Sequence, residues 1–225
     1  MEQKIIAVKR LSPRSSEQRQ EWREIRDLCC RTANAGAPIA TERWPLFGRI
    51  WIGPYERIVP QWTYAAVAED TVVGYLTGCP DTRRFARGRF WKSSLPLVVE
   101  ILSGSYARSA DRNNFVRQFF RLAKTPEESF PAEFREELAT RYPAHLHINV
   151  EASFRSQGIG ARLIEIFFSD LRNAGVAGVH LYCGAGPVSF YRKCGFEELM
   201  TIDVREASVY ALGVRLASPV PDPRP

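Results

Sequence analysis

Strand-like and helix-like patterns alternate along the chain. Residues 63–69 and 71–78 are rich in apolar and β-branched side chains and are separated by one polar position, Asp70, which predicts an antiparallel hairpin. Between residues 159 and 174, apolar side chains recur at spacings of three and four, which predicts an amphipathic helix with one broad buried face. Strands and helices interspersed in one chain predict the α/β class.

The same criteria place the remaining elements. Strands are expected at residues 4–9, 145–150, 178–183, 197–203 and 209–216. Helices are expected at residues 17–32, 111–124, 132–141 and 187–193, with a short irregular or helical piece at 42–50 and a turn at Gly53-Pro54. We therefore expect a single domain over residues 1–217, with a helical insert at 81–143 between the third and fourth core strands. Residues 218–225 are rich in proline and predict a disordered tail.

Composition is that of a globular protein. Of the 225 residues, 45% are hydrophobic and 25% are charged, which excludes an intrinsically disordered chain, a coiled coil and a collagen-like chain. No apolar stretch approaches the roughly 18 residues of a membrane span, and no signal-peptide core follows Met1. The five cysteines have no Cys-x-x-Cys spacing, so they indicate reduced thiols and a cytoplasmic location. The net charge of +6 suits an anionic ligand but is too mild to establish nucleic-acid binding.

Residues 150–161 (VEASFRSQGIGA) join a strand to a helix through a turn that contains Gly158 and Gly160. Glycine lets the backbone approach a ligand closely, because a Cβ atom would block the approach. The first turn of the helix offers free N–H groups and the positive end of its dipole, and Arg155 adds a charge, so the segment suits a pyrophosphate. Taken alone, a Gly-x-Gly turn more often marks a plain strand-to-helix connection, and neither a Walker loop nor a GxGxxG fingerprint is present.

A second segment changes this interpretation. Residues 190–196 (FYRKCGF) follow one helix and one strand later, and the two segments together resemble the GNAT acetyltransferase superfamily. In that superfamily an Arg/Gln-x-x-Gly-x-Gly/Ala turn binds the coenzyme A pyrophosphate, and a later Phe/Leu-Tyr-x-x-x-Gly-Phe helix carries a tyrosine beside the sulfur. The resemblance extends to a bacterial branch similar to the acetyltransferase-like domain of O-GlcNAc hydrolases, through residues 27–32, 53–55, 74–75, 80–82 and 142–148.

This resemblance implies a fold and a reaction. The fold would be the GNAT fold, a mixed and mostly antiparallel sheet flanked by helices. The reaction would be acetyl transfer from acetyl-CoA to a primary amine of a small molecule. The residues implied in cofactor binding are Ile148, Val150, Arg155, Ser156, Gln157, Gly158, Ile159, Gly160 and Ala161.

The resemblance also implies how the reaction would proceed. The fourth core strand would splay from the fifth, and the backbone of Ile148 and Val150 would pair with pantetheine as an extra strand. A backbone N–H near Ile148 or Asn149 would hold the oxyanion, and Tyr191 would protonate the departing thiolate. Transfer would be direct, with no covalent enzyme intermediate.

Two positions depart from the family pattern. Gly184 stands where many members carry an asparagine, which removes one contact to the cofactor arm. Ala144 stands at the usual position of the general base, so the base is unassigned. This vacancy motivates an alternative function, a non-catalytic module that binds acyl-CoA or a peptide. The oligomeric state stays open, a homodimer included.

Three histidines and two polar residues are further candidates. His145 and His147 lie two apart on a strand, so their side chains share a face. They would act as a base through a water molecule or form half of a metal site, but histidines in such positions are most often structural. No third ligand follows at a metal-site spacing, so no metal is expected. His180 is expected to be buried. Asn149 would orient a substrate amine or satisfy backbone groups, and Asp81 would cap a helix or face the substrate.

The insert contains a segment, residues 83–92, in which arginines and aromatic side chains interleave. Such a pattern can bind single-stranded nucleic acid, but the mild net charge favours a lid whose aromatics pack on the core and whose arginines face solvent. A lid here would shape the acceptor pocket. The candidate pocket walls are Trp44, Tyr55, Trp62 and Trp91. Because no apolar stretch is long enough for a membrane span and the net charge is mild, neither a membrane nor a nucleic acid is expected as a partner.

Overall fold

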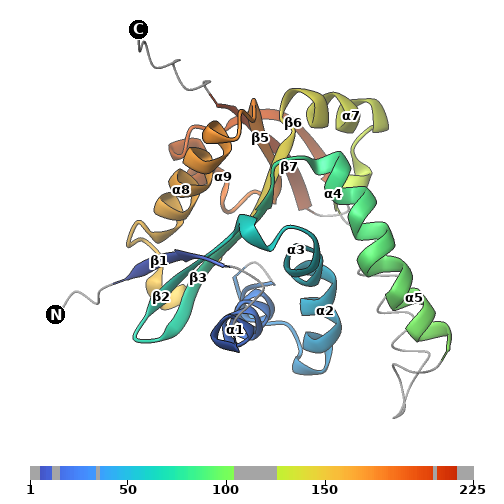
Figure 1. Ribbon diagram of the computed structural model, residues 1–225. Helices are drawn as coiled ribbons and strands as arrows, with labels where there is room; N and C mark the ends of the chain where they lie inside the picture. The colour runs from blue at the N-terminus through green and yellow to red at the C-terminus, as the bar shows by residue number, and fades with distance from the viewer. Residues whose placement is uncertain (1–5, 12–15, 34–35, 104–125, 205–206, 217–225) are drawn as a thin grey trace, which may run out of the picture.

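The computed structural model describes residues 6–11, 16–33, 36–103, 126–204 and 207–216. Within these ranges the chain forms a seven-stranded sheet with the order β1-β2-β3-β4-β5-β7-β6 (Figure 1). The strands are β1 (Ala7–Arg10), β2 (Thr63–Ala68), β3 (Thr71–Cys79), β4 (Ala144–Val150), β5 (Gly178–Gly184), β6 (Glu197–Val204) and β7 (Ala207–Arg215). Neighbouring strands are antiparallel except β4 and β5, which run parallel. The expected mixed, mostly antiparallel sheet is confirmed.

Helices cover both faces of this sheet. They are α1 (Ser16–Thr32), α2 (Trp44–Trp51), α3 (Gly53–Ile58), α4 (Thr82–Arg89), α5 (Leu95–Leu102), α7 (Ala132–Arg141), α8 (Ile159–Asn173) and α9 (Val188–Lys193). Short 3₁₀ turns lie at Thr41–Arg43 (η1), Pro60–Trp62 (η2), Pro126–Ser129 (η4) and Ala152–Phe154 (η5), and a π-helical turn at Phe90–Ser94 (η3) joins α4 to α5. In the described ranges no helix is both long enough and apolar enough to cross a membrane.

Two hydrophobic cores lie on opposite faces of the sheet, one under α8 and one under α1 (Figure 1). On the first face, α8 buries Leu163, Phe167 and Leu171 completely, because they recur at helical spacing. On the second face, α1 buries Trp22 and Ile25 against β2 and β3. Each fully buried side chain of this size contributes about 1.5–3 kcal/mol through the hydrophobic effect. The sheet is therefore held from both sides, and its central strands are rigid supports for a site.

Several expected elements agree with the structure. The hairpin of β2 and β3 turns through Glu69 and Asp70, whose φ angles of 47° and 62° match the two-residue turns that suit twisted strands. Helix α7 covers the expected residues, 132–141, because Pro131 and Pro143 bound it. The expected helix at 111–124 and the expected tail at 218–225 lie outside the described residues.

Two expectations are wrong. Residues 53–58 form helix α3 instead of a turn, because Pro54 occupies its first turn, where a missing N–H is no loss. The insert aromatics do not all pack on the core: Phe85 is buried against Tyr55, but Phe90 and Trp91 are 53% and 66% exposed. The α4–η3–α5 segment projects away from the sheet, so its middle has no core to cover it (Figure 1).

Candidate active site

The centre of the sheet opens between β4 and β5. These strands pair only at Ala144 with Val179 and at His145 with His180. Beyond this point β4 stays paired with β3 up to Val150, while β5 stays paired with β7. The second half of β4 therefore presents backbone N–H and C=O groups on an edge that no described strand occupies. The splay implied by the family resemblance is present.

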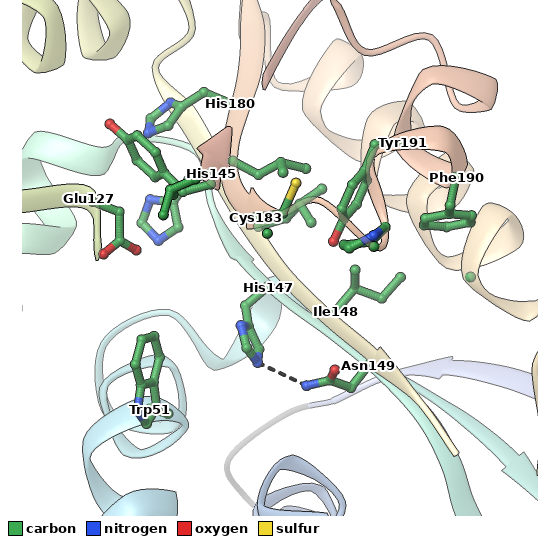
Figure 2. A pocket seen from close by; sticks show the side chains of 18 of the residues that line it. Trp51, Glu127, His145, His147, Ile148, Asn149, His180, Cys183, Phe190 and Tyr191 are labelled. Atoms are coloured by element: carbon green, nitrogen blue, oxygen red, sulfur yellow. Dashed lines mark hydrogen bonds between the residues drawn. The ribbon is translucent and has the colours of Figure 1, made fainter. Parts of the chain in front are cut away.

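The splay opens a cleft of about 1980 Å³. The start of α8 borders one end, and η4 and the first residues of β7 border the other. Ile148 and Asn149 of β4 lie near its centre in Figure 2. Tyr191 and Phe190 approach it from α9, and Trp51 approaches it from α2 (Figure 2). The cleft thus reaches β4 from both faces of the sheet, an arrangement that suits a reaction between two substrates.

Side chains of β4 alternate between these two faces. Ala144 and Leu146 point into the α8 core and are buried. His145, His147 and Asn149 point to the opposite face, where α1, α2 and α3 lie. The sequence analysis placed the two histidines on a shared face, and the structure agrees.

The turn before α8 leaves backbone donors free. Gly158 caps the helix in the left-handed conformation, with φ of 77°, and Ser156 also has a positive φ of 62°. A Cβ atom on Gly158 would meet none of the described protein atoms within 4 Å, so the space in front of Gly158 is open. Arg155 donates from Nε to the oxygen of Val150 at 3.1 Å, which holds its guanidinium beside the turn. Free N–H groups, the helix dipole and this cation together favour an anion.

Two residues of the same turn have other local roles. A Cβ atom on Gly160 would lie 2.9 Å from Cζ of Phe190, so glycine is needed here for the packing of α8 against α9. Gln157 turns its side chain back to the oxygen of Ser153 at 3.2 Å and does not line the cleft. The other expected residues of the turn line it, namely Arg155, Ser156, Gly158, Ile159, Gly160 and Ala161.

Tyr191 is a buried ionisable group on the α9 side of the cleft. Its side chain is only 8% exposed, and its hydroxyl points toward the gap beside Ile148 (Figure 2). Burial, together with the nearby Cys183 and Cys194, raises the pKa of this hydroxyl above its usual range. Tyr191 is therefore protonated at neutral pH and can act as a proton donor. Burial raises the pKa of Cys183 to about 11, so this thiol is also protonated.

His147 and Asn149 belong to one hydrogen-bonded group on the opposite face. Tyr75 Oη lies 2.9 Å from His147 Nε2, and Asn149 Nδ2 donates to Tyr75 Oη at 2.8 Å. Asn149 Nδ2 also lies 3.1 Å from His147 Nε2 (Figure 2). Trp51 stacks on the imidazole, with ring centroids 6.0 Å apart. Burial lowers the pKa of His147 to about 4, so the ring is neutral at pH 7 with Nε2 already engaged.

His145 and His180 are held by hydrogen bonds to neighbouring residues of the protein. Tyr55 Oη lies 2.8 Å from His145 Nε2, and Thr82 Oγ1 lies 2.8 Å from its Nδ1. Burial, reinforced by the neighbouring His180, lowers the pKa of His145 to about 3. His180 donates from Nδ1 to the oxygen of Tyr142 at 2.6 Å and is 3% exposed, as expected. Across the described ranges, no group of three or more His, Cys, Asp or Glu side chains is placed to hold a metal ion.

The cleft walls differ from the expected set. Tyr55 lines the cleft, but Trp44, Trp62 and Trp91 do not. Three residues that the sequence analysis did not single out line it instead, namely Trp51, Glu127 and Tyr182. They come from α2, η4 and β5, and no motif connects them. Asp81 caps α4 by accepting from the N–H of Arg84 at 2.9 Å, which is the capping role weighed from sequence.

A family model described as an acetyltransferase (GNAT) domain matches residues 128–198. These residues include β4, α8, β5 and α9, and so contain the splay, the glycine turn and Tyr191. The chain carries a GNAT acetyltransferase domain. This assignment rests on the part of the chain that builds the cleft.

Solved structures similar to this GNAT domain cover nearly the whole chain. The protein named SsHAT is 29% identical with a TM-score of 0.70, over 94% of this chain and 98% of its own. Ard1 from Thermoplasma volcanium is 14% identical with a TM-score of 0.53, over 94% and 98%. The ribosomal-protein-S18-alanine N-acetyltransferase from Escherichia coli is 10% identical with a TM-score of 0.51, over 97% and 98%.

The solved structures agree on the fold, and the family model gives the enzyme class. The chain has the GNAT fold, and the domain over residues 128–198 makes it an enzyme of the GNAT acetyltransferase class. At 14% and 10% identity the last two likenesses concern the fold alone. The likeness to the O-GlcNAc hydrolase branch stays a prediction.

Proposed function

We propose that the protein transfers the acetyl group of acetyl-CoA to a primary amine of a small molecule. One observation carries the proposal: the free edge of β4, the glycine-capped start of α8 and the Tyr191 hydroxyl all border a single cleft. These three features suit a pantetheine arm, a pyrophosphate and a leaving thiolate, in that order.

Backbone groups would supply most of the cofactor contacts. On the free edge of β4, the peptide groups of Ile148 and Val150 would hydrogen-bond to the pantetheine amides as an added strand does. The turn at residues 155–161 would bind the pyrophosphate through the free N–H groups of α8 and the charge of Arg155. Gln157 would take part only through its backbone, because its side chain is bonded to Ser153.

The reaction would be direct. The amine nitrogen attacks the thioester carbonyl carbon, a C–N bond forms, and the carbonyl electrons move to oxygen, where a backbone N–H near Ile148 or Asn149 stabilises them. The C–S bond then breaks, and Tyr191 donates its proton to the departing sulfur. The nitrogen loses its proton to solvent water, and the Tyr191 phenolate regains a proton from solvent, so the reaction has no net change in protons. Burial keeps Tyr191 protonated until that moment.

Asn149 would orient the attacking amine. Among the described residues, both of its side-chain hydrogen bonds use Nδ2, toward Tyr75 and His147, which leaves Oδ1 as an acceptor for an amine N–H. His147 is neutral and engaged at Nε2, which supports a positioning role for it. An amine held by Oδ1 presents its lone pair in a fixed direction, which favours attack.

Calorimetric titration with acetyl-CoA tests the proposal, comparing the wild type with Gly158→Glu. Glutamate at this position puts a side chain and a negative charge into the open space of the turn, so micromolar binding should be lost.

Ala144, which is fully buried, leaves no ionisable group at the usual base position and favours the alternative of a non-catalytic acyl-CoA-binding or peptide-binding module. Binding without turnover across a panel of amines would indicate that module.

A further inference from the structure

Glu127 places an unpartnered carboxylate oxygen in the cleft. Glu127 belongs to the turn η4, and its side chain points into the cleft near His145 (Figure 2). Its Oε2 is buried and has no hydrogen-bond partner among the described residues. A buried carboxylate oxygen without a donor is costly, because it has lost water and gained nothing in return. A ligand that donates a hydrogen bond to Oε2 of Glu127 would remove this cost.

The position of Glu127 is fixed by an aromatic anchor. The N–H of Phe130 donates to the oxygen of Glu127 at 3.1 Å, and Phe130 is 2% exposed. The Phe130 ring lies 5.1 Å from Tyr182 on β5 and 5.6 Å from Phe134 on α7, by ring centroids. The buried ring thus ties η4 to the sheet and to α7. The backbone that carries the Glu127 carboxylate is therefore anchored to the hydrophobic core through Phe130.

Among the described residues, no cation donates to Oε2 of this carboxylate, although Arg89 also lines the cleft. Arg135, which also lines the cleft, donates from Nε to the oxygen of Phe130 at 3.3 Å. Arg83 pairs with Glu136 at 2.7 Å. Among the described residues, no ion pair joins a lysine or arginine to Glu127, and its Oε2 lacks any donor. A cationic group of a substrate would supply the donor that Oε2 lacks among these residues.

The surroundings suit a cation better than a neutral group. Trp51, Tyr55 and Tyr182 also line the cleft, and aromatic faces attract ammonium groups. His145 and His147 add no positive charge there, because burial keeps both rings neutral at pH 7. Glu127 and Trp51 lie on the side of β4 away from Tyr191 (Figure 2). A molecule whose amine meets Asn149 would extend past Trp51 toward Glu127.

From this arrangement we infer that Glu127 binds a second cationic group of the acceptor. The inference rests on the proposed function and makes it narrower: the acceptor is a molecule with two cationic groups, one of which is acetylated while the other is held by Glu127. A diamine is the simplest member of this class. Glu127 would then determine acceptor specificity and would take no part in the chemical step.

Steady-state kinetics with matched acceptors test this inference. The probes are α,ω-diaminoalkanes of increasing chain length, each compared with the n-alkylamine of equal length. In the wild type we expect the best diamine to have a KM at least about tenfold below that of its monoamine. Glu127→Gln, which keeps the shape and removes the charge, should abolish this difference while kcat changes by less than about twofold. Glu127→Asp should retain part of it.

A matched control and two opposing outcomes complete the design. Glu133→Gln removes a carboxylate of equal charge from an exposed position on α7 outside the cleft, and should leave the preference unchanged. Equal KM values for diamines and monoamines in the wild type would overturn the inference. So would a Glu127→Gln effect confined to kcat and equal for both acceptors, since that describes a base. Thermal unfolding of each variant establishes that the fold is intact.

A binding measurement separates this inference from the proposed function. If no amine is acetylated although acetyl-CoA binds, the proposed function fails. The diamine is then titrated calorimetrically into the protein saturated with coenzyme A. Binding that weakens at least about tenfold in Glu127→Gln would still support the cation site. Absence of binding, or equal binding to both proteins, would refute it.

Discussion

Gly160 lies so close to Phe190 that a Cβ atom on the glycine would come within 2.9 Å of the ring. This contact joins the first turn of α8 to α9, the helix that carries Tyr191. Gly158, two residues earlier, has open space around it and a φ of 77°. Glycine is therefore needed at the two positions for different reasons. At position 160 it permits the packing of the two helices, and at position 158 it permits the backbone conformation of the helix cap.

Gly160→Ala should destabilise the protein by about 1–3 kcal/mol, because the added methyl group overpacks the contact with Phe190. Urea unfolding measures the change in free energy. Adding Phe190→Leu should recover part of the loss, because the smaller side chain makes room. Gly158→Ala should cost about 1–2 kcal/mol through its positive φ, and Phe190→Leu should not relieve that cost. If Phe190→Leu restored stability to both glycine variants, or to neither, the two glycines would not be required for separate reasons.

Tyr191→Phe should lower kcat by about a hundredfold or more, because the departing thiolate loses its proton donor. Phenylalanine fills the same space, so the Kd for acetyl-CoA should stay within about twofold. Rapid-mixing kinetics at saturating acetyl-CoA and calorimetric titration provide the two readouts. An unchanged kcat at saturation would show that Tyr191 is not the acid.

Asn149→Leu should raise the KM of the acceptor and lower kcat by about tenfold, because Oδ1 no longer orients the amine. Acetyl-CoA binding should hardly change. Asn173→Leu, at the exposed end of α8, is a control of equal chemical type away from the cleft. Tyr75→Phe should show a weaker version of the same effect, since it removes the hydroxyl that receives Asn149 Nδ2. Loss of acetyl-CoA binding in Asn149→Leu would instead assign this residue to the cofactor.

Stability should fall as the pH decreases from about 6.5 toward 4. Burial lowers the pKa of His147 and His180 to about 4 and that of His145 to about 3, all below the ordinary value of 6.5. Below pH 6.5 the unfolded chain therefore binds protons that the folded chain does not, which favours unfolding. Each histidine adds a slope of about 1.4 kcal/mol per pH unit in this window.

The histidine share of this slope can be isolated by substitution. His147→Gln removes one titrating group, so urea unfolding free energies between pH 7 and 5 should decline less steeply than in the wild type. Carboxylates contribute equally to both proteins and cancel in the difference. Identical slopes for the two proteins would contradict a buried, neutral His147.

Much of the fold could be predicted because local pattern and burial agree in it. Helix α8 has six buried apolar residues at helical spacing, and α7 is bounded by prolines, so both were found from the sequence. The segment at Gly53-Pro54 was not, because glycine and proline are typical of turns whereas the contacts of Tyr55 with Phe85 hold this one as a helix.

The candidate site likewise has one part that the sequence predicts and another part that it does not. Its proposed cofactor half lies in two short motifs, so the turn at 155–161 and Tyr191 could be assigned from the resemblance to the GNAT superfamily. Its acceptor half is assembled from α2, η4 and β5, and Trp51 and Glu127 have no sequence signal that connects them. Likewise, nothing in the pattern of residues 83–92 shows that Phe90 and Trp91 lie beyond the reach of the core. Such positions depend on tertiary packing, which local pattern does not encode.

The π-helical turn at Phe90–Ser94 aligns two distant contacts along a single rod. Phe85 packs on Tyr55 of α3, and Leu97 packs on Leu46 of α2. At about 100° per residue, the interval from 85 to 97 in an uninterrupted α-helix would turn these side chains roughly 120° apart. A π turn absorbs one residue, which reduces the offset to about 20° and brings both onto one side. Removing one residue from this turn would thus straighten the rod into a plain α-helix and keep both ends attached, whereas adding one would twist Leu97 away from Leu46.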